Sequence, residues 1–345
     1  MLKKSKLTLV PLLLAAALLC SACGQPSTEE AQLSTEETQA STEEAQLSAE
    51  ETQSSTEEIV LDEETELVPL SGSAPISSLL EPEASGTVTY GNEKVSIDAS
   101  NSRDGYVMIK YLGKNSKVKI QITGPSSVTY TYNVTESGRY EVFPLSDGSG
   151  SYKICVYENT SGKKYATAYS LSSLKVKLTD EFAPFLRSNQ YVNFDEDSKC
   201  VAKAAKLCAG ESDTLKKIDA VYTYVIKHLS YDYNLAKNVT SGYLPDLDKV
   251  MKKGKGICFD YAALMTAMLR SQGIPTKLVV GYSGTAYHAW INTYSEESGW
   301  MDAVIYFDGS QWKLMDPTFA STGKSSKAIM KYIGNGANYT AKYLY

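Results

Sequence analysis

The sequence has very little histidine, and this scarcity limits the chemistry that it can support. Its 345 residues include only two histidines, His228 and His288, and the Cys-x-x-Cys pair that it contains, Cys20 and Cys23, lies in the signal-like start of the chain. Zinc sites in proteins are built mostly from clusters of these two residue types. We therefore expect no metal site, and nothing in the sequence calls for a cofactor. Any catalysis that uses an imidazole must use one of the two histidines.

Lysine and arginine are absent from residues 27–66, a stretch that contains 13 Glu and Asp62. It repeats a seven-residue pattern, written STEEAQL, STEETQA, STEEAQL and SAEETQS. A coiled coil needs two strong apolar positions in each heptad, whereas these heptads offer at most one Ala and one Leu. Such a segment buries too little apolar surface to offset the entropy of ordering. We expect residues 24–84 to be a disordered acidic linker that acts as a tether.

No apolar run near the N-terminus is long enough to span a bilayer comfortably. The run LTLVPLLLAAALL follows three lysines and precedes the small residues CSACG at 20–24. This order is typical of a secretory signal. The residues before Cys23 resemble a bacterial lipobox, with Cys20 where leucine is usual. The resemblance implies that residues 1–23 are a lipoprotein signal and that Cys23 is lipidated; a plain secreted protein is the alternative.

The acidic linker also determines the sign of the net charge, which is formally −6. Removing its 14 acidic residues changes the charge to +8, and removing the three N-terminal lysines leaves +5 for residues 67–345. The remainder of the chain is therefore mildly basic. This charge suits an anionic wall or membrane surface.

Residues 85–178 are rich in Val, Ile, Tyr and Thr, and Gly, Asn, Asp and Ser interrupt them. Short alternating runs such as GYVMIKYLG, KVKIQITG and SVTYTYNVT are typical of an all-β sandwich of immunoglobulin or fibronectin type. Its tyrosines could form a glycan-binding face, although alternating tyrosines more often pack a small sandwich. Cys155 lies inside one of the runs, where we expect a buried apolar role.

Residues 179–345 begin with helical patterns. The segment DSKCVAKAAKLCAG predicts a helix that ends at Gly210, and TLKKIDAVYTYVIKHLSYDY predicts a second helix capped around Asp213. Cys200 and Cys208 are eight residues apart, about 12 Å along a helix, so they cannot form a disulfide with each other. The six cysteines do not look like a disulfide framework.

Cys258 has the surroundings that a cysteine nucleophile needs. It follows Gly254 and Gly256 and opens CFDYAALMTAMLRSQG, whose apolar residues recur at helical steps up to Gly273. The thiolate is the reactive form of cysteine, and a helix N-terminus or a nearby imidazole favours it. We expect Cys258 to lie in the first turn of this helix.

His288 and Asp316 supply the two other groups of a triad. His288 lies in YHAWINTY, which alternates like a strand. Asp316 ends the strand-like run QWKLMD, and the turn at 308–310 could bring it beside His288. His228 lies at the C-terminal end of a predicted helix, where the helix dipole and solvent exposure explain the presence of a histidine without a catalytic role. His288 is therefore the candidate base. Cys258 as nucleophile, His288 as base and Asp316 as orienting carboxylate would then form a Cys-His-Asp catalytic triad.

These segments resemble the core of the transglutaminase-like superfamily of papain-like cysteine enzymes. The resemblance covers about residues 180–330 and implies an α+β fold in which the helix bearing the nucleophile packs on an antiparallel sheet. It also implies a tyrosine-containing segment after the helix that precedes the nucleophile, and here that tyrosine is Tyr231. A functional Tyr231 would line the cleft or donate a hydrogen bond to an oxyanion; the alternative is that Tyr231 packs under the helix. The matching pieces are GICFDYA at 256–262, GIP at 273–275, KLVVGY at 277–282, His288-Ala-Trp290 and Asp316-Pro317.

We therefore expect a surface-anchored cysteine enzyme that acts on amide or peptide carbonyls through Cys258, His288, Asp316 and a thioester. Water would make it a protease or amidase, and an amine acceptor would make it a crosslinking transferase; the sequence does not choose. The alternative is a non-catalytic cell-wall-binding or adhesion lipoprotein that works through its β-sandwich, with the papain-like core as a scaffold.

The expected partners follow from this interpretation. They are a protein or peptide substrate, which could be linked to peptidoglycan, and a membrane reached through the lipid anchor on Cys23. We expect no nucleic-acid partner and a monomeric protein. The expected location is extracytoplasmic, either anchored to the bacterial cell membrane or secreted.

Overall fold

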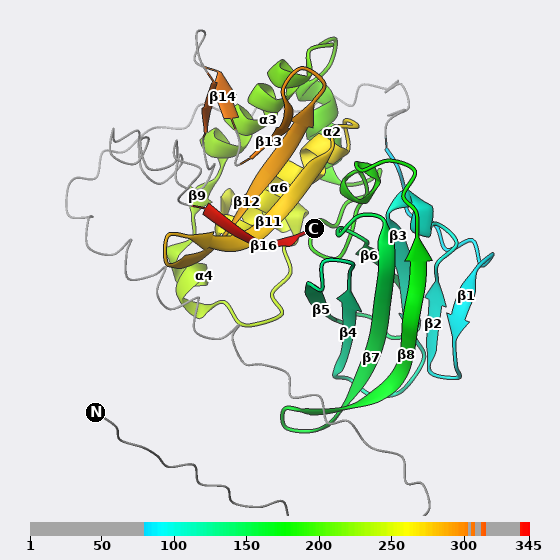
Figure 1. Cartoon of the computed structure of the whole chain (residues 1–345). Helices are drawn as coiled ribbons and strands as arrows, with labels where there is room; N and C mark the ends of the chain where they lie inside the picture. The colour runs from blue at the N-terminus through cyan, green and yellow to red at the C-terminus, as the bar shows by residue number, and fades with distance from the viewer. Residues whose placement is uncertain (1–78, 303–304, 308–311, 315–338) are drawn as a thin grey trace, which may run out of the picture.

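The computed structural model describes residues 79–302, 305–307, 312–314 and 339–345 (Figure 1). Residues 24–78 of the predicted acidic linker, the predicted lipidation site Cys23 and the predicted triad residue Asp316 lie outside these residues. The described part contains a purely β region, coloured cyan to green in Figure 1, and a mixed α/β region, coloured light green to red. The predicted α+β class is confirmed.

Two four-stranded antiparallel sheets form the β region (Figure 1). Their apolar side chains join one core, as the alternation of buried and half-buried residues along Val118–Thr123 illustrates. Several tyrosines, such as Tyr111 and Tyr152, are buried in this core, so they pack the sandwich. The first sheet, in spatial order, is β1 (Thr89–Gly91), β2 (Val95–Asp98), β3 (Tyr106–Tyr111) and β6 (Tyr140–Pro144). The second is β5 (Thr129–Asn133), β4 (Val118–Thr123), β7 (Gly150–Ser161) and β8 (Lys164–Val176).

The mixed region contains α2 (Lys199–Leu207), α3 (Thr214–His228), α4 (Tyr233–Asn238), α5 (Leu247–Lys253) and α6 (Cys258–Arg270). The helix α3 begins at its predicted cap, because the Asp213 side chain accepts hydrogen bonds from the backbone N–H groups of Leu215 and Lys216. The helix α6 is buried over almost its whole length. A helix that is buried all round lies in the centre of a fold, and α6 contacts α2, α3 and α5.

The sheet beside α6 has the order β13-β12-β11-β16, and its neighbouring strands are antiparallel. Its strands are β11 (Thr276–Ser283), β12 (Ala286–Ser295), β13 (Gly299–Met301) and β16 (Tyr339–Leu344). The helix α6 packs on β11 and β12, as the fold prediction requires. Two smaller pairs are the antiparallel β14 (Ile305–Phe307) and β15 (Trp312–Leu314), and the parallel β9 (Ser230–Tyr231) and β10 (Lys255–Gly256).

The sandwich and the mixed region share one continuous apolar core. Tyr130 and Tyr132 of β5 pack edge-on against Tyr345, which follows β16. On the connection between the two regions, Arg187 donates from Nη1 to the carbonyl oxygen of Asp104 at 3.0 Å. The β region is therefore joined to the core by packed side chains as well as by the chain. Among the described residues, no helix is long and apolar enough to cross a membrane.

Candidate active site

Cys258 is the first residue of α6, as its surroundings in the sequence predict, and it is 7% exposed. Ile257 is the N-cap, with an extended backbone, and offers no side-chain acceptor to the first turn. The unpaired N–H groups and the aligned peptide dipoles of a helix start favour a negative charge there. This position favours the thiolate form of a cysteine.

Asp260 supplies the cap that Ile257 lacks. Its Oδ2 accepts a hydrogen bond from the backbone N–H of Ile257 at 2.9 Å, and its Oδ1 accepts one from the Tyr243 hydroxyl at 2.7 Å. The Asp260 side chain is fully buried, and burial raises the pKa of its carboxyl group while these two hydrogen bonds oppose the rise. A buried carboxylate therefore fixes the backbone just before the cysteine.

The spacing Gly-x-Cys-x-Asp has a steric reason. A Cβ on Gly256 would lie 2.6 Å from the Cβ of Asp260, which is closer than real side chains approach. Glycine at this position leaves room for the Asp260 carboxylate to fold back onto the Ile257 N–H. The glycine and the aspartate around Cys258 thus belong to one local structure.

Tyr231 lies beside the loop that precedes Cys258. In the parallel β9–β10 pair, Tyr231 is the partner of Gly256, and the next residue, Asp232, donates its backbone N–H to the Gly256 carbonyl at 2.9 Å. The Tyr231 ring is half-buried and packs edge-on against Tyr233, with ring centroids 5.0 Å apart. This position is compatible with each of the roles considered for Tyr231, which remain predictions.

His288 lies near the start of β12 and is 2% exposed. Its cross-strand partner is Gly281 of β11, and its ring stacks on that of Trp290 with centroids 6.3 Å apart. These residues share one face of the hairpin. The other face contributes apolar side chains to the core around α6, namely Leu278, Val280, Ala289 and Ile291.

The connection between α6 and β11 places Cys258 and His288 at the same end of the helix–sheet layer. Residues 271–275 turn the chain back, so that β11 runs along α6 in the opposite direction. The 13 residues of α6 rise about 18 Å. From Thr276 to Gly281, the partner of His288, β11 rises about 17 Å. From these two rises we expect His288 to lie level with Cys258 along the layer.

The third predicted member, Asp316, lies outside the described residues, and its place in the triad stays a prediction. The other histidine, His228, ends α3 and is exposed. Its Nδ1 lies 2.8 Å from the Tyr224 carbonyl oxygen, and its ring packs on the Tyr224 ring. These local contacts account for His228 without a catalytic role.

The other described cysteines, Cys155, Cys200 and Cys208, are buried free thiols. Burial raises the pKa of Cys200 to about 12, and it also raises the pKa of Cys208. A raised pKa makes a thiol unreactive at neutral pH, because the thiolate is the nucleophile. Among the described residues, no three or more His, Cys, Asp and Glu gather in a group that could hold a metal ion.

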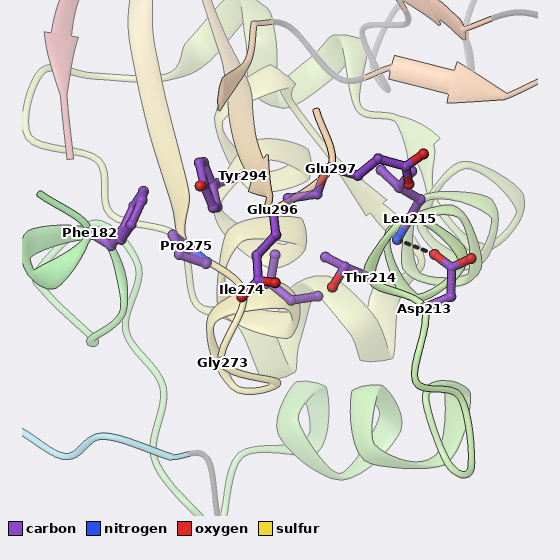
Figure 2. Close-up of a pocket in the computed structure, with 11 residues that line it drawn as sticks. Phe182, Asp213, Thr214, Leu215, Gly273, Ile274, Pro275, Tyr294, Glu296 and Glu297 are labelled. Atoms are coloured by element: carbon purple, nitrogen blue, oxygen red, sulfur yellow. Dashed lines mark hydrogen bonds between the residues drawn. The ribbon is translucent and has the colours of Figure 1, made fainter. Parts of the chain in front are cut away.

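A pocket of about 450 Å³ opens at the opposite end of α6 from Cys258 (Figure 2). Figure 2 shows Phe182, Pro275 and Tyr294 on one side and Leu215 on the other, with the Glu296 side chain between them. The pocket borders the turn after α6 and the end of β12. Because α6 is about 18 Å long, this pocket is separate from the nucleophile. The sequence patterns did not indicate it.

A central helix that opens on a buried cysteine and packs on an antiparallel sheet is the arrangement of papain-like cysteine enzymes. Residues 201–317 match the Transglutaminase-like superfamily. This part of the chain is therefore a transglutaminase-like core, as the motifs around Cys258 and His288 predict. The presence of such a core supports the general prediction that the protein is a cysteine enzyme.

Relatives of the chain are distant. The uncharacterized protein YebA of Bacillus subtilis (strain 168) is 24% identical over an alignment of 188 residues, and the match covers 47% of this chain. The chain spans about a quarter of the length of that curated relative, with 25% of it covered. The solved structures that resemble the chain include the periplasmic domain of TgpA from Pseudomonas aeruginosa and a red sea bream transglutaminase.

Their overall similarity to this chain is low. The TgpA domain is 14% identical with a TM-score of 0.31, and the match covers 71% of this chain and 99% of that one. The sea bream enzyme is 12% identical with a TM-score of 0.29, and the match covers 68% of this chain and 54% of that one. The superfamily match at residues 201–317 therefore carries the assignment of the core.

Proposed function

We propose that the protein is a cysteine enzyme that acts on amide or peptide carbonyls, with Cys258 as the nucleophile and His288 as the base. The observation that carries this proposal is the position of Cys258. It lies at the buried start of α6, and α6 packs on the hairpin that carries His288. A helix start and an imidazole are the two features that generate a reactive thiolate in proteins.

The reaction passes through a thioester. His288 accepts the proton of Cys258, and the thiolate attacks the amide carbonyl carbon to give a tetrahedral oxyanion. The backbone N–H of Cys258 stabilises this oxyanion at the helix start. The intermediate collapses with cleavage of the C–N bond, and His288 protonates the leaving amine. Asp316 holds the His288 tautomer and stabilises the imidazolium.

Tyr231 is the candidate for a further group in the cleft, because its backbone pairs with the loop that leads into Cys258. A hydroxyl there is suited to donate a second hydrogen bond to the oxyanion. Tyr231→Phe separates this role from packing, because it removes the hydroxyl and keeps the ring. A lower kcat with an unchanged KM indicates oxyanion stabilisation. Unchanged kinetics indicate packing beneath the helix.

The acceptor that resolves the thioester decides the overall reaction. Water yields a carboxylic acid, as in a protease or amidase, whereas a primary amine yields a new amide, as in a crosslinking transferase. The same nucleophile and base serve both outcomes, so the access of water and amine to the cleft determines their ratio.

We place this activity outside the cytoplasm, on a protein held to the cell membrane through a lipid on Cys23. The support is the signal-like start of the sequence and the acidic heptads that follow it. As a flexible coil, about 60 linker residues reach on the order of 45 Å. That reach gives the enzyme access to protein or peptide substrates near the membrane surface.

The experiment uses the full chain and peptides containing glutamine, with and without a fluorescent primary amine. Ammonia release, peptide cleavage and incorporation of the amine are followed together by mass spectrometry and fluorescence. Trapping of the peptide as a thioester on Cys258 and the loss of all products in Cys258→Ala are the expected results. Cys155→Ala is the matched control, because Cys155 is a buried thiol in the sandwich.

Product formation that survives Cys258→Ala overturns the proposal. An unreactive wild-type Cys258 overturns it as well. If the folded Cys258→Ala protein instead retains binding to cell-wall fragments, and no substrate reacts with the wild type, the adhesion alternative replaces the enzyme.

A further inference from the structure

We propose that the β-sandwich positions the nucleophile of the core through Tyr191, Tyr243 and Asp260. Two contacts start from adjacent residues at the end of β5 and reach the residues on both sides of Cys258. This inference rests on the proposed function in one respect, which is that Cys258 is the nucleophile. It assigns the sandwich a part in the reactivity of the core, in addition to any role as a spacer.

The first contact is a row of aromatic rings. Tyr132, the penultimate residue of β5, stacks on Tyr191 of the connecting segment, with centroids 5.6 Å apart and an angle of 28°. Tyr191 in turn packs against Phe259, again with centroids 5.6 Å apart. Phe259 directly follows Cys258 in the first turn of α6. Aromatic pairs at such distances stabilise a contact beyond the effect of the area that they bury.

The second contact starts at Asn133, the last residue of β5. Gln190 donates a hydrogen bond to the carbonyl oxygen of Asn133 at 2.8 Å and thereby fixes the strand end to the connecting segment. A Cβ on Gly242 would lie 3.1 Å from the side-chain amide nitrogen, Nδ2, of Asn133, so the loop around residue 242 lies against the sandwich. Gly242 has a φ of 86°, a conformation that suits glycine.

Tyr243 carries this second contact to the nucleophile. Its hydroxyl donates to Asp260 Oδ1, and Asp260 Oδ2 accepts the backbone N–H of Ile257, the residue before Cys258. Breaking a hydrogen bond to a buried charged group leaves its partner unsatisfied, which destabilises the folded arrangement. Without the Tyr243 hydroxyl, the buried Asp260 carboxylate lacks one of its two donors and is expected to move. The first turn of α6 then loses the hydrogen bond between Asp260 and the Ile257 N–H.

The two contacts hold different sides of the same turn. The aromatic row fixes Phe259 after Cys258, and the hydrogen bonds fix Ile257 before it. Catalysis by a thiolate depends strongly on where the sulfur lies relative to its base and to the carbonyl carbon. The chemistry of Cys258 therefore depends on residues that do not touch the substrate.

The test measures the rate at which iodoacetamide alkylates Cys258 in the full chain between pH 5 and 9, with the site located by mass spectrometry. Tyr243→Phe is expected to slow alkylation by about tenfold, the factor that corresponds to a lost interaction of about 1.4 kcal/mol. The pH at half-maximal rate should also shift. The matched control is Tyr152→Phe, which removes a buried hydroxyl that donates to Leu145 and Gly148 carbonyls within the sandwich.

A second pair of variants tests the aromatic row. Tyr191→Leu should slow alkylation of Cys258, whereas Tyr191→Phe, which keeps the ring, should restore the wild-type rate. Asn133→Ala removes the side-chain amide that lies against Gly242 and keeps the carbonyl that accepts from Gln190, so it should give a smaller decrease in the same direction. With a peptide substrate, all the slow variants should lower kcat and leave KM unchanged, because the substrate does not touch these positioning residues.

The outcomes separate this inference from the proposed function. A wild-type Cys258 that behaves as an ordinary thiol at every pH contradicts the proposed function. A reactive wild type whose rate and pH profile are unchanged in Tyr243→Phe, Tyr191→Leu and Asn133→Ala contradicts the positioning role alone. Equal slowing by Tyr152→Phe and Tyr243→Phe contradicts it too, because general loosening of the fold then explains both. If Tyr243→Phe fails to fold, the alkylation rates of Tyr191→Leu, Tyr191→Phe and Asn133→Ala decide whether the sandwich positions Cys258.

Discussion

Arg270 donates a hydrogen bond from Nη2 to the carbonyl oxygen of Tyr345 at 2.6 Å, which ties the last turn of the nucleophile helix to the residue after β16. Its Nη1 donates to the Arg187 carbonyl at 2.6 Å and its Nε to the Thr276 carbonyl at 2.8 Å. The side chain is fully buried, and this burial lowers the pKa of Arg270 to about 9, so it remains protonated at neutral pH. One guanidinium thus joins the connecting segment, the start of β11 and the end of β16.

Arg270→Met is therefore expected to lower the free energy of unfolding by about 3 kcal/mol or more, because it removes the donors to three carbonyl oxygens. Urea denaturation followed by circular dichroism measures the change. Arg139→Met is the control, since Arg139 is an exposed residue paired with Glu136 on the surface. The control should change stability by less than about 0.5 kcal/mol. Equal losses in both variants would show that the three hydrogen bonds contribute little.

Alkaline pH should destabilise the interface between the sandwich and the core. Burial raises the pKa of Tyr130 from 10.0 to about 12. Because the folded-state pKa lies above the unfolded value, the contribution of Tyr130 to stability is full below pH 10 and is lost as the pH rises towards 12. A shift of two units corresponds to about 2 to 3 kcal/mol. Burial of Cys200, whose pKa is raised from 9.0 to about 12, acts in the same direction from pH 9 upwards.

The measurement is the melting temperature as a function of pH between 8 and 11, for the wild type and for Tyr130→Phe. The variant has no phenol to ionise at this position, so its melting temperature should fall less steeply above pH 10. At neutral pH the two proteins should differ little, since the Tyr130 hydroxyl makes only a long contact of 3.4 Å with the Leu344 N–H. Parallel curves at every pH would refute the assigned role of Tyr130 ionisation.

Thiol labelling should distinguish the described cysteines. At pH 7.5 the native protein is expected to incorporate one equivalent of iodoacetamide at Cys258, and Cys200 should react only after unfolding, because its raised pKa keeps it protonated. Peptide mapping before and after addition of guanidinium chloride gives the pattern. Rapid native labelling of Cys200 would mean that α2 opens readily, and it would contradict the buried position found for this thiol.

Much of the core was predictable from periodicity. The helical steps from Cys258 to Gly273 and the alternation around His288 are local patterns, and local patterns determine helices and hairpins. Asp260 was also within reach, because an acid three residues after an N-cap is a known cap signal. It could have been assigned this role from the sequence.

Other features had no local signal. Tyr243 lies in a loop, and its contact with Asp260 joins residues on separate elements. The alternating tyrosines of β5 predicted a packed strand, but no pattern could show that the packing partners are Tyr191 and Tyr345. Packing between distant segments depends on the whole fold. For the same reason the pocket near Glu296 could not be predicted.

Gly256→Ala tests the link between the backbone before Cys258 and the carboxylate after it. The added methyl group would lie 2.6 Å from the Asp260 Cβ, so Asp260 must move and its hydrogen bond to the Ile257 N–H must lengthen. We expect a loss of about 2 to 3 kcal/mol in stability and slower alkylation of Cys258. Gly162→Ala is the control, because Gly162 has a φ of 53° with no atom within 4 Å of an added Cβ.

The control should lose only about 1 to 2 kcal/mol through backbone strain and keep the wild-type alkylation rate. Stability comes from urea denaturation, and reactivity comes from the iodoacetamide assay under native conditions. The comparison decides between two readings of the Gly-x-Cys-x-Asp spacing. If Gly256→Ala loses stability but alkylates at the wild-type rate, the glycine and the aspartate support the fold alone. If both quantities fall together while the control changes only in stability, the cap formed by Asp260 sets the position of the nucleophile.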